Sequence, residues 1–128
     1  YDLTIGGVAA TGTITDNDAA AISSVSSETG VEGTDLVHTV DMSIASLTDD
    51  TYAFSLVDNT ATAGSDYNGT PVFSNGVTLS GGNITVPAGV TSFTVTVSTT
   101  DDTIDENAET YDLTIGGVAA TGTITDND

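Results

Sequence analysis

Apolar and polar residues alternate along most of this chain, in short runs separated by glycine, asparagine, aspartate or proline. The clearest run spans residues 92–98. Its Phe93, Val95 and Val97 face one way, and threonine and serine side chains face the other. Such a period of two residues is typical of a strand with one buried face. No stretch of useful length has a helical period, so the pattern predicts an all-β protein.

The other strands are predicted at residues 20–26, 36–44, 51–58, 71–74, 77–79, 84–86, 111–115 and 118–125. In the second of these runs the side chains expected to share one face are Leu36, His38, Val40, Met42 and Ile44. We expect residues 27–34 to form a turn, and residues 92–98 to pair with residues 111–115 as a hairpin. Short strands at this spacing indicate an antiparallel, immunoglobulin-like β-sandwich of seven to eight strands.

The sequence also contains a long internal repeat. Residues 1–18 recur without a change at 111–128, an offset of 111 − 1 = 110 residues. Identity over such a length indicates a tandem array. We interpret residues 1–18 as the tail, meaning the last two strands, of a preceding identical repeat, and residues 19–128 as one complete repeat. Because an isolated hairpin is marginally stable, residues 1–18 are expected to be disordered, to pair with another chain, or to derive from a longer array.

Charge narrows the possible partners. The chain has 19 acidic residues, no lysine or arginine, and a net charge of −19. Such a chain is not expected to bind nucleic acid or an anionic membrane surface directly. Cations or a basic partner are favoured, although the charge could also serve only for solubility in a salty medium. The absence of cysteine excludes disulfides, and no run of 18 apolar residues predicts a membrane span.

The densest group of acids lies between two predicted strands. Five carboxylates occur within nine residues, at Asp101, Asp102, Asp105, Glu106 and Glu109. Two like charges 4 Å apart repel by about 1 kcal/mol in water and about 4 kcal/mol near a protein surface. A whole domain is stable by only about 5–15 kcal/mol. Carboxylates that are close together must therefore be protonated or bound to a cation.

Strand direction predicts where these acids lie. If strands alternate up and down, the acidic stretch shares one pole with Glu28, Glu32, Asp58, Asp126 and Asp128, while Asp49 and Asp50 lie at the other. Ligands that are all oxygen select Ca²⁺ or Mg²⁺, and many carboxylates on flexible loops favour Ca²⁺. The alternative is that these are ordinary solvated loop acids. Asp49 and Asp50 are expected to be solvated or, alternatively, to face the pole of the preceding repeat.

Several motifs together resemble the Calx-β domain: VEG at 31–33, VDNTATAGSDY at 57–67, VPAGVTSFTVTV at 86–97, DDTIDENAETYDLTI at 101–115 and GTITDND at 122–128. The variant is similar to repeats of large RTX/Lap-type bacterial surface adhesins, and the resemblance covers residues 19–128. It implies Ca²⁺ bound at one end of a β-sandwich by Glu32, Asp58, Asp102, Glu106, Glu109, Asp126 and Asp128. Thr103 and Asn127 stand where the family often has further acids, which implies fewer ions or weaker binding.

The sequence gives little support for an enzyme. The one histidine, His38, lies on the apolar face of its strand and is expected in the core. A G-x-S-x-G nucleophile motif is absent. A glycosidase needs a carboxyl group in an apolar cleft, whereas the acids here lie in polar loops. We therefore expect no catalytic activity.

The predicted function is that of an extender. In this interpretation each repeat is one unit of a secreted bacterial cell-surface adhesin, and Ca²⁺ stiffens the joints between neighbouring repeats. The alternatives are a structural subunit of an extracellular filament or surface layer, and a module that binds carbohydrate or another ligand. The last alternative predicts exposed aromatic side chains in the loops.

Overall fold

The computed structural model describes residues 1–14 and 19–128. These residues form strands and no helix, which confirms the all-β prediction. The described residues contain no helix that is long and apolar enough to cross a bilayer.

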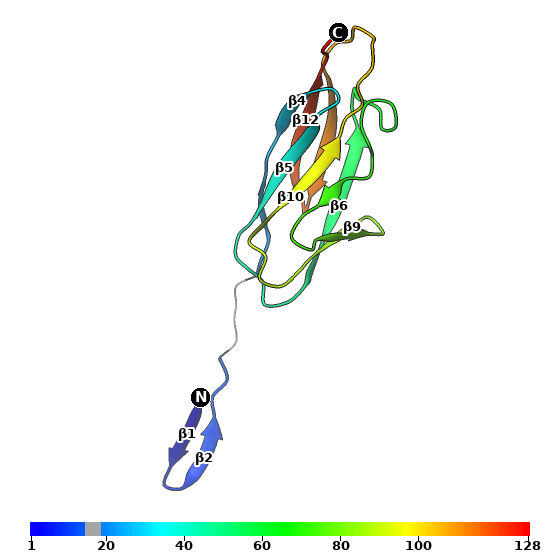
Figure 1. The fold of residues 1–128 in the computed structure, drawn as a ribbon. Coiled ribbons are helices and arrows are strands. Elements are labelled where there is room, and N and C mark those ends of the chain that lie inside the picture. The colour runs from blue at the N-terminus through cyan, green and yellow to red at the C-terminus, as the bar shows by residue number, and fades with distance from the viewer. Residues whose placement is uncertain (15–18) are drawn as a thin grey trace.

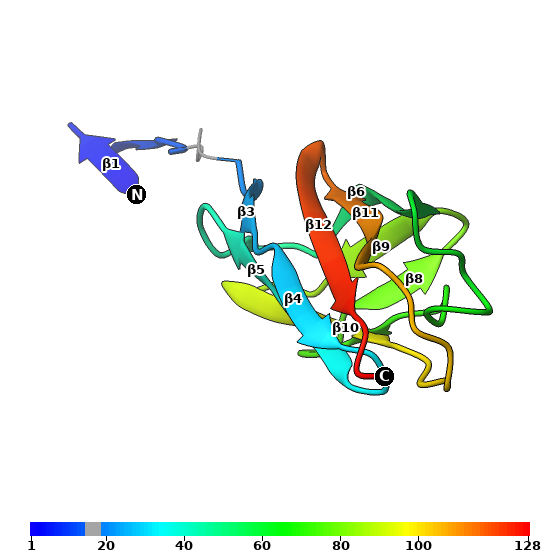
Figure 2. The same cartoon turned by 90° about the horizontal axis from the view of Figure 1, so that it is seen from above.

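The strands are β1 (Asp2–Ile5), β2 (Val8–Thr11), β3 (Ile22–Val25), β4 (Glu28–Val31), β5 (Asp35–Met42), β6 (Asp50–Asp58), β7 (Val72–Phe73), β8 (Thr78–Ser80), β9 (Asn83–Val86), β10 (Ser92–Ser98), β11 (Glu109–Ile115) and β12 (Val118–Thr125). One sheet has the order β3-β5-β10-β7, and the other has the order β4-β12-β11-β6-β9-β8. The two sheets face each other in Figures 1 and 2, so the predicted β-sandwich is confirmed.

The alternation in the sequence corresponds to burial in the structure. Phe93, Val95 and Val97 on β10 are all buried between the sheets. The predicted inward face of β5 is also correct up to Met42. Ile44 is an exception because it is 41% exposed. The ladder between β3 and β5 ends at the pair Ile22–Met42, so the chain has already left the sheet at residue 44.

Two pairing predictions were wrong. Residues 28–31 form strand β4 rather than a turn, and β4 pairs in parallel with β12. This strand is short, lies at a sheet edge and contains Gly30, so it carries no clear alternation. Strand β10 pairs with β5 and β7, not with β11. The ten-residue connection 99–108 crosses from one sheet to the other, a distance of about 10 Å in sandwiches, and is longer than hairpin loops usually are.

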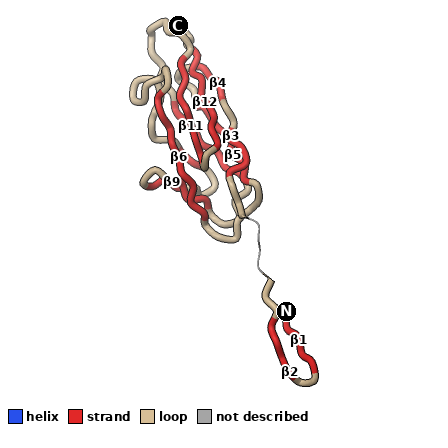
Figure 3. Tube along the Cα trace, turned by 180° about the vertical axis from the view of Figure 1, so that it is seen from behind, coloured by secondary structure: helices blue, strands red, loops and turns tan. Residues whose placement is uncertain are grey.

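The predicted pair of strands in the first segment is present as the hairpin β1-β2. It lies outside the sandwich in Figures 1 and 3, and every residue of both strands is exposed. Tyr1 is 75% exposed, whereas Tyr111, at the same position of the repeated sequence, is fully buried in the six-stranded sheet. Residues 15–18 of this segment lie outside the described residues. The assignment of the hairpin to a preceding repeat, and its pairing with another chain, stay predictions.

Candidate metal centre

The parallel pairing of β4 with β12 brings two distant acids together. The ladder ends with Val31 opposite Thr125. One residue further on, the backbone N–H of Glu32 donates to the Thr125 carbonyl at 2.9 Å. Glu32 therefore lies beside Asp126, although 94 residues separate them (126 − 32). The Glu32 side chain is only 7% exposed, which is unusual for an acid.

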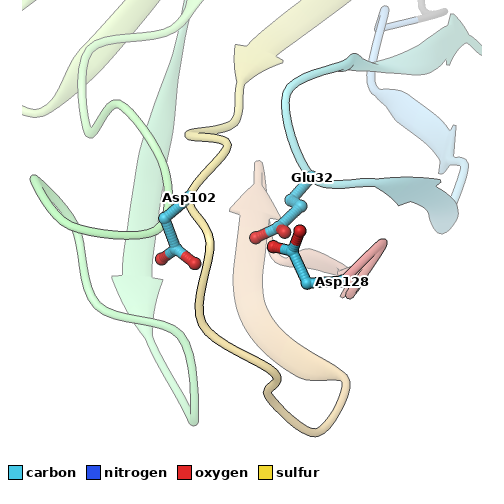
Figure 4. Close-up of side chains that lie close together, drawn as sticks. All are labelled: Glu32, Asp102 and Asp128. Atoms are coloured by element: carbon cyan, nitrogen blue, oxygen red, sulfur yellow. The ribbon is translucent and has the colours of Figure 1, made fainter.

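A first group of carboxylates forms around Glu32. One oxygen each from Glu32, Asp102 and Asp128 lie within 4.8 Å of one another, and the side chains converge in Figure 4. They come from the β4–β5 turn, the connection after β10 and the end of the chain after β12. Gly33 in the turn has φ +81°, and a Cβ there would lie 2.9 Å from the Cβ of Asp101. Glycine is thus needed for the turn to approach the acidic connection closely.

A second group consists of Asp66, Glu106 and Glu109, again with one oxygen from each within 4.8 Å of the others. Asp66 was not among the predicted ligands. It lies in the loop between β6 and β7, where its carboxylate accepts from the Thr62 backbone N–H at 2.8 Å. The available signal was its position in the VDNTATAGSDY motif, in a loop that begins at the acidic pole.

The two groups share a small hollow. Its lining includes Glu32 from the first group, the three acids of the second group, and Asp126. The volume is about 20 Å³, which is room for a species about the size of one water molecule. Five acids from four segments of the chain therefore surround a space of ionic size.

Two oxygens at this hollow have no hydrogen-bond donor. Glu32 Oε1 and Asp126 Oδ1 are buried, and no group among the described residues donates to either. Buried acceptors nearly always have a partner, and two ionised carboxylates cannot donate to each other. With no lysine or arginine in the chain, either a proton on one of the two carboxylates or a bound cation must compensate them. The all-oxygen donor set fits Ca²⁺.

The local environment disfavours ionisation of three of these acids. Burial, and then the charge of Asp102, raises the pKa of Glu32 to about 7. Burial, and then hydrogen bonding with Asp66, raises the pKa of Glu109 to about 7. The pKa of Glu106 is also raised, by burial and by Asp102. These carboxylates hold protons more tightly than a solvated acid does, so a bound divalent cation would have to displace protons near neutral pH.

Asp126 behaves differently from its neighbours. Burial alone would raise its pKa, but hydrogen bonds with the backbone amides of Glu106 and Asp128 and with the side chains of Glu32 and Asp105 together outweigh that effect, and the pKa is lowered. Asp126 is therefore ionised at neutral pH, and its charge lies beside Glu32. Such a pair of carboxylates either shares a proton or, once that proton is released, offers two negative charges to a divalent cation.

Asp58 lies in neither carboxylate group. Its Oδ1 accepts hydrogen bonds from the Ala63 backbone N–H at 2.8 Å and from the Tyr67 hydroxyl. The Tyr67 hydroxyl, and then Ala63, lowers the pKa of Asp58. These contacts hold the loop that carries Asp66, and the Tyr67 ring packs on Tyr111 with centroids 4.8 Å apart. The role of Asp58 as a ligand stays a prediction.

The structure thus brings together most of the predicted ligands. Those found in the two groups are Glu32, Asp102, Glu106, Glu109 and Asp128. Asp126 lines the hollow between them. Glu28 is not in the top loop as expected, because it begins β4 opposite Gly122. Asp50 begins β6, a full strand before Asp58, which agrees with its predicted place at the other pole.

His38 is a core residue, as expected from its strand position. It is fully buried, and its Nδ1 donates to the Ser26 carbonyl at 2.7 Å. Its Nε2 therefore accepts from the Tyr111 hydroxyl, also at 2.7 Å. Both ring nitrogens are occupied in holding the sandwich together, which leaves none for a metal.

No family profile and no curated protein sequence matches this chain. Among solved structures, it is similar to CBD12 from CALX1.2, with a TM-score of 0.65 and 20% identity over 85% of this chain and 45% of that one. The calcium binding domain CBD12 of CALX1.1 gives 0.64 and 18%, over 87% and 45%. The apo-form Calx CBD1 domain gives 0.59 and 19%, over 87% of this chain and 100% of that domain. The chain spans less than half of the CBD12 structures but all of CBD1. At these identities the likeness shows the fold, a Calx-β-like sandwich.

Proposed function

We propose that this chain binds Ca²⁺ at the pole formed by Glu32, Asp102, Asp126 and Asp128. The observation that carries the proposal is the pair of buried, donor-free oxygens on Glu32 and Asp126. The second carboxylate group, around Asp66, supplies further oxygen ligands beside the same hollow. Two of the similar structures are described as calcium binding or as an apo form of such a domain, which supports the choice of cation.

The repeat gives this site a mechanical role. In the sequence, residues 1–18 are the same as residues 111–128 and continue directly into Ala19. The carboxylate pole therefore lies at the joint between two successive repeats. In the absence of a cation the clustered charges repel one another. A bound Ca²⁺ neutralises the joint and fixes the angle between neighbours, so the array becomes a rigid rod.

Such a rod is suited to an extender of a secreted bacterial cell-surface adhesin, whose partners are the neighbouring repeats of the same array. Extracellular calcium modules bind with Kd values of roughly 10⁻⁴–10⁻³ M. A chain without cysteine has no disulfides to stabilise it, and cation binding to the folded state supplies stability instead.

Small-angle X-ray scattering tests this role directly. Two further copies of residues 19–128 are added after residue 128, which continues the repeat. The scattering of this three-repeat protein is measured in millimolar Ca²⁺ and in chelator. We expect the maximum dimension to fall, and the profile to broaden, when the cation is removed. The matched control carries Glu32→Gln in every repeat and is expected to resemble the chelated array in both buffers. An unchanged maximum dimension in chelator would reject the role.

The alternative of a ligand-binding module predicts exposed aromatic side chains in the loops. In the sandwich, Tyr67, Phe93 and Tyr111 are buried and Tyr52, Phe54 and Phe73 are partly buried. These positions leave little aromatic surface for stacking on a sugar ring. Specific binding on a glycan array would favour the module over the extender. Head-to-tail filaments of the isolated chain under the electron microscope would favour the filament subunit.

A further inference from the structure

The pole opposite the carboxylates has an open hollow of about 440 Å³. Its lining includes Ala20, Ile44, Leu47, Asp50 and Tyr52. The Tyr52 hydroxyl donates to the Ala20 carbonyl at 3.0 Å, which ties the start of the repeat to this wall. Leu47 is 87% exposed and Ile44 is 41% exposed. This surface therefore presents unprotected apolar side chains to whatever lies beside it.

The carboxylate pole has an apolar side chain of its own. Ile104 lies in the acidic connection and is 63% exposed. Its backbone N–H donates to Asp102 Oδ1 at 2.8 Å, which fixes the backbone of this stretch. A single exposed isoleucine is common on protein surfaces. It becomes informative when the chain itself determines what lies opposite.

The internal repeat determines that arrangement. Only six residues connect the end of β12 to the start of the next β3, namely 126–128 and then 19–21 (3 + 3). Six residues span at most about 20 Å. The carboxylate pole of one repeat must therefore lie close to the hollow of the next repeat.

We propose that Ile104 of each repeat inserts into the hollow of the following repeat, between Ile44, Leu47 and Tyr52. This docking rests on the proposed tandem array and names the surface on which the joint closes. Asp50 at the hollow has the same sign of charge as the carboxylate pole. The apolar contact therefore forms fully only when a cation neutralises that pole.

Disulfide trapping tests the contact, because the natural chain contains no cysteine. Residues 22–124 contain all of the buried core among the described residues, so one further copy of residues 19–128 can be added to the full chain. The first repeat carries Ile104→Cys and the second carries Leu47→Cys. Under mild oxidation in Ca²⁺ we expect an intramolecular disulfide in most molecules, seen by mass spectrometry and by non-reducing electrophoresis. In chelator we expect the yield to fall several-fold.

The matched control combines Ile104→Cys with Val72→Cys in the second repeat. Val72 is 66% exposed and lies on the edge strand β7, opposite the middle of β10. A disulfide needs Cα atoms within about 7 Å, so this pair is expected to stay reduced. Equal yields for the two pairs would overturn the docking.

Scattering on the same proteins separates the two proposals. If the array stiffens with Ca²⁺ but the pair of positions 104 and 47 does not cross-link above the control, the docking is wrong and the proposed function stands. If the pair cross-links but the dimensions do not respond to Ca²⁺, the docking is supported and calcium stiffening is rejected. Leu47→Ser provides an independent check. In the chain without added repeats it should leave Ca²⁺ affinity within about twofold, and in the extended array it should reduce the calcium-dependent stiffening.

Discussion

At the scale of the residue, the unusual feature is an acid that the fold buries beside another acid. Glu32 is 7% exposed, and its Oε1 has no donor. The sequence predicts that many acids gather near one pole, and the structure brings most of those acids together there. It gives no sign that Glu32 is buried beside Asp126, because that contact depends on a parallel strand pairing which the sequence does not reveal.

Substituting this residue should separate binding from folding. We expect Glu32→Gln to weaken Ca²⁺ binding at least about tenfold, or about 1.4 kcal/mol of binding free energy, because a ligand charge is lost. In calcium-free buffer at pH 8 the same variant should unfold at a higher temperature than the natural chain, because no buried charge remains at that position and the amide can donate. Calorimetric titration and thermal unfolding measure the two effects.

Asp41→Asn is the matched control for this substitution. Asp41 is exposed on β5 and accepts from Ser24 at 3.2 Å, which an amide oxygen also does. Asp41→Asn should change neither the Ca²⁺ affinity nor the unfolding temperature. A Glu32→Gln protein with natural Ca²⁺ affinity would remove this residue from the site.

At the scale of the element, the conformation of the loop between β6 and β7 depends on single hydrogen bonds. The Tyr67 hydroxyl bonds to Asp58 at the start of the loop that carries Asp66. Tyr67→Phe should cost about 1 kcal/mol of unfolding free energy, and it should weaken Ca²⁺ binding a few-fold because Asp66 becomes less well placed. Urea unfolding and calcium titration measure these changes.

Tyr52→Phe is the control, because it loses a hydroxyl contact at the opposite pole. It should cost a similar amount of unfolding free energy and leave the Ca²⁺ affinity unchanged. A Tyr67→Phe chain of natural affinity would show that this loop does not contribute.

The two copies of the hairpin sequence provide an internal control. Tyr111 and Gly122 are partners in the β11–β12 ladder, and a Cβ on Gly122 would lie 2.0 Å from the Tyr111 ring. Because the buried ring cannot move away, we expect Gly122→Ala to destabilise the chain by about 3 kcal/mol. Gly12→Ala changes the same sequence in the exposed hairpin, where Tyr1 can turn into solvent, and should stay within about 0.5 kcal/mol. Urea unfolding measures both variants. If they lose the same free energy of unfolding, the hairpin β1-β2 is packed like β11 and β12, contrary to this account.

The sequence predicted elements better than connections. Strands with clear alternation, such as β5 and β10, were located correctly because one face is buried along their length. Strand β4 was missed because a short edge strand with glycine has little side-chain pattern. The partner of β10 was also missed. Alternation specifies which face is buried, but it does not specify which neighbouring strand completes the ladder.

At the scale of the whole molecule, stability should depend on pH in opposite ways with and without calcium. Glu32 and Glu109 have pKa values raised to about 7 from 4.5. Between pH 4.5 and 7 the folded chain therefore binds more protons than the unfolded chain, so calcium-free stability falls as pH rises through this range. Calcium needs these groups ionised, so its stabilising effect grows over the same range.

Thermal unfolding at pH 5 and pH 8 measures this reversal. In chelator we expect the higher midpoint at pH 5, and in millimolar Ca²⁺ we expect the higher midpoint at pH 8. Glu32→Gln should reduce the dependence in both buffers, because one of the responsible groups no longer titrates. A calcium-free midpoint that rises from pH 5 to pH 8 would contradict the assignment.

The most direct test is a crystal structure grown in millimolar CaCl₂, with anomalous differences recorded at long wavelength. We expect an anomalous peak in the hollow beside Glu32, Asp126 and Asp128, with carboxylate oxygens about 2.3–2.6 Å from it. A map with only water at this position, or with these carboxylates turned away from one another, would contradict the central claim that a divalent cation binds at this pole.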